Sequence, residues 1–546
     1  MEDNDERCQY FDHERRICYK DMPNWKQLKE EFVTGHVGTT PREVLLVCSA
    51  ASIGVFLCLE IQQSVSFKRL EHVAGMEAAI VLIPMLLSQT RFLYSLGCPL
   101  LAIELALAIW LKYDRTKTNQ KTNADNDSSA PQISEDSAHV QTKSQLNFLT
   151  AYRSTVSFMT FIAILAVDFK VFPRRFAKTE TTGYGLMDIG ASSFVISAGL
   201  VSAYARSGFG GNSKLRADQN IIRSIQQSLP LVVLGAVRLV LNKGIDYQEH
   251  VSEYGVHWNF FLTLAVVNIL STCFRQLKLG FMTLEILPWL CLVIYQVILR
   301  LGVQHFIEDA PRSYNHPSSI NFFAFLDENS PFQKWVGDML QTSCDLFYAN
   351  REGLLGCVGY FCLHCISEEI ARFCLWSDEF SSLKSADTRL SSEQTFESHI
   401  CGRLAAMCVV LWKLHWIVSG IFGVPVSRRS TNLPFLTWSL AQNMTTLFLS
   451  CLVYTFAGDG SANLERIHQP NLPIFNAINR NGLIMFLIAN ILTGLVNKSI
   501  NTLQTNDCLA VCILLVYLGS IAGVALLLDR YFNVTIGLRS LLSCMA

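Results

Sequence analysis

The sequence predicts an all-α, polytopic membrane protein with about 13 transmembrane helices, and two observations lead to this fold class. First, 50% of the 546 residues are hydrophobic and only 16% are charged, with a mean hydropathy of +0.29. A soluble chain carries about 25% charged residues. Second, the apolar residues gather in runs of roughly 20, the length that crosses a bilayer core about 30 Å thick.

Thirteen such runs follow one another along the chain and form one predicted membrane domain over residues 44–528. Two of them are rich in small or polar residues and are the weakest candidates, namely 184–204 and 353–373. The other runs are 44–61, 73–90, 92–111, 149–168, 220–241, 257–274, 281–302, 398–422, 434–456, 475–496 and 507–528.

Four polar segments lie outside these runs. Residues 1–43 mix acids and bases and lack the basic start, apolar run and cleavage site of a secretory signal peptide. The loop 113–147 has almost no large apolar residue, so we expect it to be disordered. Residues 304–351 contain several aromatic side chains and are expected on the membrane surface, and 529–546 form a C-terminal tail.

The composition also argues against two classes of partner. Lys and Arg number 44 against 45 Asp and Glu, so the net charge of −1 creates no field that would attract nucleic acid. Most of the 18 cysteines lie within apolar runs, where they behave as small hydrophobic residues. Cys362 and Cys365 have a CxxC spacing, but no second pair completes a zinc site, and we predict no bound metal.

An ionisable group at the end of an apolar run is the first candidate for chemistry, because such groups are costly in a membrane. The run ending at Asp168 is followed by Pro173, which breaks a helix, and then by Arg174, Arg175 and Lys178. Asp168 could act as a general base held by Lys178, or the two could form a salt bridge that seals the helix end. Paired arginines also suit phosphate recognition.

Three further polar junctions fall on the same predicted membrane face as Asp168–Glu180, because each follows an even number of spans. These are Glu253–Asn259, Asn350–Gly353 and Ser427–Pro434, whereas the loop 113–147 falls on the opposite face. This arrangement predicts one polar site that opens towards one side of the membrane. Lys and Arg are balanced between the two sets of loops, so charge does not identify the side.

The same junctions carry a family resemblance. The stretches are VDFKVFPRRFAKTE (167–180), YGLMDIG (184–190), EYGVHWNFF (253–261), NREG (350–353) and VSRRSTNLP (426–434). Phe32-Val33 and Gly38-Thr39-Thr40 add to them near the N-terminus. Together they resemble the GPI-anchor inositol acyltransferase family, which includes phosphatidylinositol-glycan class W of animals and the GPI-anchored-wall-transfer protein of fungi.

The resemblance implies a multi-pass enzyme of the endoplasmic reticulum membrane. It would transfer a fatty acyl chain, usually palmitoyl, from acyl-CoA to the inositol 2-hydroxyl of glucosaminyl-phosphatidylinositol during GPI-anchor biosynthesis. Acyl-CoA would be a co-substrate, with no other cofactor. A secondary hydroxyl needs a positioned base to attack a thioester, and we assign this role to Asp168. Lys178 would hold the base or stabilise the oxyanion, and the matching Asp and Lys are the suspected catalytic pair of the family.

Other polar residues of the junctions are candidates for binding substrate. His257 is a second candidate base, although a histidine that begins a helix often serves only as a hydrogen-bonding residue. The arginines are candidates for the phosphates of CoA or of the lipid. The predicted substrate-binding residues are Arg174, Arg175, His257, Asn259, Arg351, Arg428, Arg429 and Asn432.

Three other functions remain open on the residues alone. A secondary transporter would have a similar number of spans, but with broken helices at mid-membrane. Another acyl-CoA-dependent membrane transferase, acting on a sugar amine, would need a similar site. A structural subunit of the GPI pathway would tolerate the loss of Asp168. We favour the inositol acyltransferase because of the resemblance.

Overall fold

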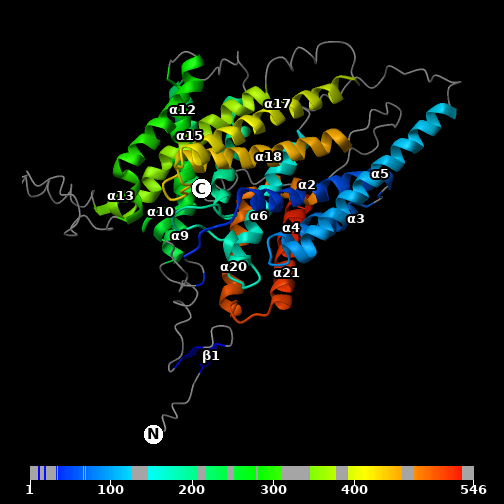
Figure 1. The fold of residues 1–546 in the computed structure, drawn as a ribbon, viewed down its shortest axis with the longest axis horizontal. Coiled ribbons are helices and arrows are strands. Elements are labelled where there is room, and N and C mark those ends of the chain that lie inside the picture. The colour runs from blue at the N-terminus through cyan, green and yellow to red at the C-terminus, as the bar shows by residue number, and fades with distance from the viewer. Residues whose placement is uncertain are drawn as a thin grey trace, which may run out of the picture.

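The computed structural model confirms the all-α fold class. It describes residues 10–12, 17–19, 32, 35–65, 67, 69–125, 146–206, 217–242, 251–277, 281–309, 345–376, 391–457 and 472–531. Two three-residue strands, β1 (Tyr10–Asp12) and β2 (Ile17–Tyr19), pair antiparallel near the N-terminus, and every other element is helical. Figure 1 shows the helices gathered in one body with β1 outside it.

The first half of the chain forms helices that end at polar or proline-containing turns. Thr40 caps the first long helix by accepting a hydrogen bond from the Glu43 amide, and Pro41 occupies its first turn. The helices are α2 (Pro41–Ser64), α3 (Leu70–Glu77), α4 (Ile83–Ser88), α5 (Cys98–Asp125), α6 (Asn147–Ala166), α7 (Ile189–Leu200), α8 (Ala203–Arg206), α9 (Ala217–Asn242), α10 (Val251–Tyr254) and α11 (Phe260–Arg275). Wider π-helical turns at Ala78–Leu82 and Leu93–Gly97 join α3 to α4 and precede α5.

The second half contains the remaining helices. They are α12 (Phe281–Ile298), α13 (Gln304–Asp309), α15 (Arg351–Cys374), α17 (Ser391–His415), α18 (Leu433–Ala457), α19 (Pro473–Arg480), α20 (Gly482–Ser499) and α21 (Asp507–Tyr531). The long helices α17 and α18 lie side by side in Figure 1. The predicted run 475–496 is divided at Asn481 into α19 and α20, and the Glu77 carboxylate accepts the Ile474 and Phe475 amides at the start of α19.

Ten helices in the described part of the chain are long and apolar enough to cross a membrane, which supports a multi-pass membrane protein. The other three predicted runs contain α7, α9 and α11. With 12 and 16 residues, α7 and α11 are about 18 Å and 24 Å long, shorter than a bilayer core. The total of about 13 spans therefore stays a prediction.

Three boundaries differ from the sequence prediction. The helix α5 continues to Asp125, so the predicted disordered loop does not begin at 113, and 126–145 lie outside the described residues. The helical segment after α12 continues through α13 to Asp309, six residues into the predicted surface segment, whose residues 310–344 are not described. The last helix extends into the predicted tail as far as Tyr531.

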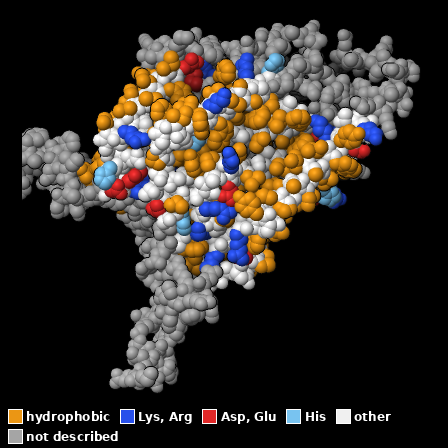
Figure 2. Space-filling model, viewed as in Figure 1, with side chains coloured by type: hydrophobic (Ala, Val, Ile, Leu, Met, Phe, Trp, Pro, Cys, Tyr) orange, Lys and Arg blue, Asp and Glu red, His pale blue; other side chains and the backbone are white. Residues whose placement is uncertain are grey.

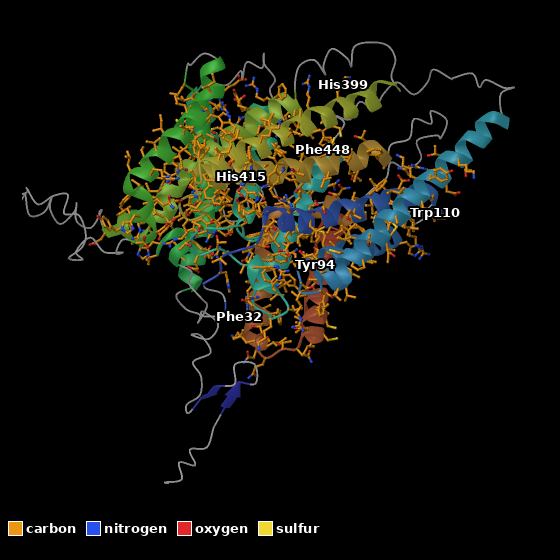
Figure 3. All side chains as sticks on the ribbon, viewed as in Figure 1. Phe32, Tyr94, Trp110, His399, His415 and Phe448 are labelled. Carbon is orange, nitrogen blue, oxygen red and sulfur yellow. The ribbon has the colours of Figure 1, made fainter. Side chains whose placement is uncertain are left out.

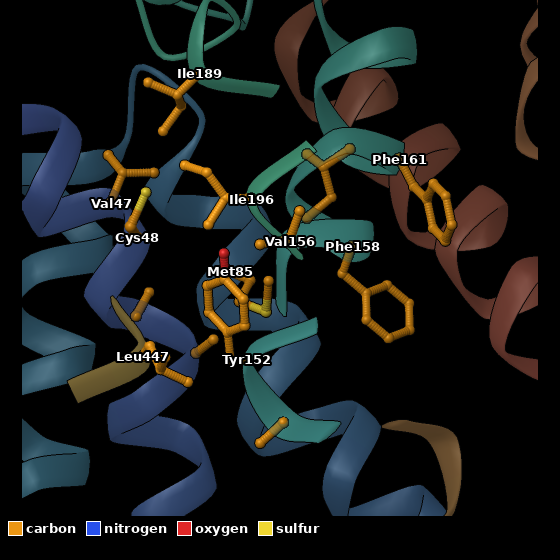
Figure 4. Packing of buried hydrophobic residues seen from close by; sticks show 14 of the residues in the cluster. Val47, Cys48, Met85, Tyr152, Val156, Phe158, Phe161, Ile189, Ile196 and Leu447 are labelled. Atoms are coloured by element: carbon orange, nitrogen blue, oxygen red, sulfur yellow. The ribbon is translucent and has the colours of Figure 1, made fainter. Parts of the chain in front are cut away.

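The core is built around α6, which contacts α2, α7, α18, α19, α20 and α21. Its side chains Tyr152, Phe158 and Phe161 are fully buried, and Figure 4 shows them among residues of α2, α4, α7 and α18. The Tyr152 hydroxyl donates to the Asn443 side-chain oxygen at 2.9 Å. Such polar pairs and close packing hold membrane helices together, because lipid provides little hydrophobic driving force between them.

The outside of the body is apolar. Figure 2 shows hydrophobic side chains covering much of the visible face over α18 and α5. Trp110, labelled on α5 in Figure 3, is 58% exposed and Val410 on α17 is equally exposed. An apolar surface of this extent fits contact with lipid and not with water.

Substitution of Gly199, which lies where α7 meets α15, should destabilise the fold. A Cβ atom at this position would lie 2.8 Å from the Ser367 Cβ and 2.9 Å from the His364 carbonyl oxygen. We expect Gly199→Ala to cost about 1–3 kcal/mol through overpacking. Thermal unfolding of the detergent-solubilised protein measures this, and Gly494→Ala on α20 is the control because no atom lies within 4 Å of its added Cβ. Equal unfolding temperatures for the two variants would contradict the predicted close contact.

Candidate functional site

The four polar junctions predicted from the sequence contact one another at one end of the helices. Side chains and main chain from each junction reach the next. The contacts are the ion pair between Lys178 and Glu253, the His257 amide donating to the Asn350 side-chain oxygen at 2.6 Å, the Glu352–Arg429 ion pair at 3.3 Å and the Asp188–Arg428 ion pair at 2.9 Å. The gathering of these junctions into one region therefore agrees with the sequence analysis.

The segment after α6 is folded around the side chain of Arg174. Helix α6 ends at Ala166, and Pro173 precedes a single turn of 3₁₀ helix at Arg174–Phe176. The Arg174 guanidinium donates to the carbonyl oxygens of Phe169 at 3.0 Å and Phe172 at 3.0 Å. Arg174 therefore ties together the main chain of the turns that follow the helix.

Asp188 fixes the other end of this segment. Its carboxylate is 1% exposed and accepts the Thr179 hydroxyl at 2.8 Å, the Thr179 amide at 3.2 Å and the Gly185 amide at 3.0 Å. The Arg428 guanidinium completes the set at 2.9 Å. A buried carboxylate is stable only when it is paired and hydrogen-bonded, and these four donors meet that requirement.

Gly183 allows a neighbouring segment to approach this region closely. Gly183 has a φ of +138°, and a Cβ there would lie 2.1 Å from the Val37 carbonyl oxygen. Its amide donates to the Val426 carbonyl at 2.9 Å, and the Thr39 amide donates to the Tyr184 carbonyl at 2.7 Å. Three stretches distant in sequence thus meet through their main chains.

A cavity of about 270 Å³ opens beside these contacts. Charged side chains line one part of it: Lys178, Asp188, Arg238, Glu253 and Arg428. Apolar and aromatic side chains of α6, α7, α11 and α20 line another part, including Met159, Ile164, Phe194, Phe261 and Phe486. The cavity can therefore receive a molecule that has both a charged group and a hydrocarbon portion.

The charged part of the cavity contains three cations and two carboxylates. Burial alone would lower the pKa of Arg428, but the carboxylates of Glu253 and Asp188 raise it above its ordinary value. One cationic charge remains in excess when all five groups are ionised, which favours an anionic ligand. Among the residues described, no group of three or more His, Cys, Asp or Glu side chains is placed to hold a metal ion.

Three of the predicted site residues line the cavity, namely Lys178, Arg428 and Asn259. Asn259 also caps α11, because its side-chain oxygen accepts the Phe261 amide at 3.1 Å and the Leu262 amide at 3.2 Å. His257 is exposed and does not line the cavity.

Asp168 does not line the cavity, but it continues the face of α6 that does. The lining residues of this helix recur every three or four positions and end at Ile164, and Asp168 is the next position on that face, just past the helix end. Its carboxylate accepts the side-chain amide of Asn497, from the end of α20, at 2.7 Å. The structure brings Lys178 to Glu253. The assignment of Asp168 and Lys178 as a catalytic pair stays a prediction.

Most of the remaining arginines bind protein groups outside the cavity lining. Arg175 forms three hydrogen bonds to the Glu43 carboxylate, at 2.8 Å, 3.0 Å and 3.1 Å. Arg351 is buried and donates to the Ile307 carbonyl at 3.1 Å, and Arg429 donates to the same carbonyl at 3.3 Å. These contacts show how the arginines support the junctions, and their predicted role in phosphate binding is untested.

Asn432 also supports a junction. Its side-chain oxygen accepts the Ser427 amide at 3.2 Å and the Phe435 amide at 3.1 Å, and its side-chain nitrogen donates to the Pro425 carbonyl at 2.8 Å. These bonds close the loop that carries Arg428 and begin α18. Asn432 is fully buried and does not line the cavity.

Three charged residues that line the cavity are not among the predicted site residues. They are Asp188, Glu253 and Arg238. Asp188 and Glu253 stand in two of the motifs that carry the family resemblance, MDIG and EYGVHWNFF, so the signal was available. Arg238 lies in a predicted span, where an ionisable side chain is itself a signal.

Comparison with known proteins identifies the family. The GWT1 family model matches residues 25–324 and 319–528. The chain belongs to the GWT1 family. It is 34% identical over 537 residues to GPI-anchored wall transfer protein 1 of Aspergillus fumigatus, with 93% of this chain and 98% of the relative covered. The protein of the same name from Gibberella zeae is 32% identical over 548 residues, covering 95% of this chain and all of the relative.

A third relative extends the comparison to a yeast. GPI-anchored wall transfer protein 1 of Candida albicans is 31% identical over 529 residues, covering 92% of this chain and 98% of the relative. The similarity therefore runs through both the charged junctions and the helices between them. Membership of the GWT1 family supports a role for this membrane protein in GPI-anchor biosynthesis.

Loss of the Asp188 charge should destabilise the junctions. In Asp188→Asn, the buried Arg428 guanidinium loses its ion-pair partner, and we expect a cost of about 3–5 kcal/mol. The matched control is Asp529→Asn, which breaks an ion pair with Arg480 whose side chains are 29% and 51% exposed. That control should cost less than about 1 kcal/mol. Thermal unfolding in detergent measures both, and equal losses would contradict the anchoring role of Asp188.

Proposed function

We propose that the chain is an acyltransferase of GPI-anchor biosynthesis in the endoplasmic reticulum membrane. It moves a fatty acyl chain, palmitoyl in the first instance, from acyl-CoA to the inositol 2-hydroxyl of glucosaminyl-phosphatidylinositol. Family membership supports the pathway. The observation that carries the reaction is the cavity, because it joins a cationic region to an apolar wall within the helices.

Each part of the cavity suits one part of the substrates. The apolar wall formed by Met159, Phe194 and Phe486 suits a hydrocarbon chain, whose transfer from water is worth about 0.8 kcal/mol per buried CH₂. Arg238 and Arg428 suit the phosphate groups of the lipid or of CoA. The thioester and the inositol hydroxyl would then meet beside Lys178.

Asp168 is the proposed base in this reaction. Its carboxylate takes the proton of the inositol 2-hydroxyl while the oxygen attacks the thioester carbonyl. The carbon–sulfur bond then breaks, an ester forms, and the CoA thiolate leaves and takes up the proton. Asn497 holds the carboxylate just past the end of the α6 face that lines the cavity.

Lys178 is the proposed electrostatic partner. Its ammonium lines the cavity, where a positive charge stabilises the oxyanion that forms on the thioester carbonyl. Such stabilisation is stronger in a site that excludes water, because the effective dielectric constant is lower. Asp168 and Lys178 would thus act on opposite partners of the reaction.

Loss of the Asp168 carboxylate should abolish most of the transfer. We expect Asp168→Asn to lower the rate at least about 100-fold, equivalent to about 3 kcal/mol. The assay follows acylinositol formation in microsomes from cells that lack their own enzyme and express this chain. The control is Asp529→Asn, which changes a partly exposed carboxylate far from the motifs in sequence and should keep its rate.

The outcomes of this assay separate the alternatives. If the wild-type chain forms no acylinositol, the proposed reaction is wrong. If it does and Asp168→Asn loses less than tenfold, Asp168 serves as a structural residue and not as the base. Acylation of the glucosamine nitrogen in place of the inositol would identify a sugar-amine transferase.

Filling the apolar wall should change the acyl-chain preference. Ala163 lines the cavity on α6, and Ala163→Phe would remove space for the end of a long chain. We expect kcat/KM for palmitoyl-CoA to fall about tenfold or more relative to octanoyl-CoA, the effect that a few methylenes have in a hydrophobic pocket. Ala106→Phe on the exposed face of α5 is the control. A uniform loss with both chain lengths would contradict an acyl-binding role for this wall.

A further inference from the structure

The ion pair between Lys178 and Glu253 joins two junctions that are 75 residues apart in sequence, and both side chains line the cavity. Lys178 is 36% exposed and Glu253 is 12% exposed, so the lysine is the more accessible member of the pair. This pair therefore differs from Glu352–Arg429, in which both side chains are buried and neither lines the cavity.

The other charged and titratable groups around this part of the cavity make the Lys178 ammonium dependent on Glu253. Asp188 lies on the same segment as Lys178, Tyr254 lies beside Glu253 on α10, Arg238 comes from α9, and Arg428 precedes α18. The Asp188 carboxylate is already bound by Arg428, by Thr179 and by the Gly185 amide. Among the described lining residues, Glu253 is thus the carboxylate in contact with Lys178, and its negative charge also acts on Arg428.

We propose that Glu253 is a positioning residue that holds the Lys178 ammonium at the cavity wall during acyl transfer. This inference rests on the proposed function, in which Lys178 stabilises the thioester oxyanion. Glu253 acts through Lys178 and does not touch the reacting atoms. A lysine side chain is long and flexible, so its ammonium stays at one place only when a partner holds it, and the Glu253 carboxylate is that partner.

The experiment measures kcat and KM for acyl transfer by the purified full-length chain in lipid vesicles. In Glu253→Gln, we expect kcat to fall about tenfold, because the ammonium is no longer held where the oxyanion forms. KM for acyl-CoA should change little, because the ammonium acts on the transition state.

Three variants control the experiment. Glu253→Asp keeps the charge on a shorter side chain and should recover part of the lost kcat. Glu352→Gln breaks a buried pair that does not line the cavity, and it should change the unfolding temperature more than kcat. In a Lys178→Ala background, adding Glu253→Gln should lower kcat no further, because the ammonium that Glu253 holds is already absent.

The inference is overturned if Glu253→Gln raises KM and leaves kcat unchanged, or if Glu253→Asp recovers none of the lost kcat, because Glu253 would then have a structural role only. It is also overturned if Glu253→Gln lowers kcat equally in the Lys178→Ala background, since Glu253 would not act through Lys178. Absence of acyl transfer by the wild-type chain would instead reject the proposed function, so the two failures are distinguishable.

Discussion

The arrangement of the cavity depends on one buried interaction, the contact between the Asp188 carboxylate and the Arg428 guanidinium. Asp188 also binds the Thr179 amide and hydroxyl, which immediately follow Lys178, and therefore determines where that lysine emerges. Arg428 in turn belongs to a loop that Asn432 closes. A single carboxylate thus connects the segment after α6 to the segment before α18, and the cavity lies between them.

This arrangement follows from the low dielectric constant of the surroundings. A charged group buried near lipid is tolerated only when its hydrogen bonds and its charge are satisfied by protein. The chain meets this condition with arginines whose planar guanidinium groups bind several main-chain oxygens at once, as Arg174 and Arg351 do. Helix ends expose such oxygens, so the polar residues gather where helices end and little charge remains elsewhere.

The same physics explains how much could be predicted from the sequence. The length of the apolar runs predicted helices, and the structure has helix in all thirteen runs. A chain segment that crosses the hydrocarbon core must be helical to pair its main-chain groups, whatever its neighbours are. Length could not show that α19 and α20 are separate or that α7 is short, since these features depend on contacts such as the Glu77 cap of α19. Proximity in the motifs suggested that Asp168 and Lys178 act together, but the partner of Lys178 in the structure, Glu253, is 75 residues away in sequence.

The contrast between the two kinds of cation is the most informative feature of the site. The arginines of the junctions are bound by protein groups: Arg174, Arg351 and Arg429 donate to main-chain carbonyls, and Arg175 and Arg428 pair with carboxylates. Lys178 is a compact, strongly hydrated charge on a flexible stem, and its side chain is 36% exposed, whereas that of Arg428 is 8% exposed. Both side chains of the Lys178–Glu253 pair line the cavity, so the ammonium is held where a ligand can meet it. This placement favours a chemical role for the ammonium over a purely structural one.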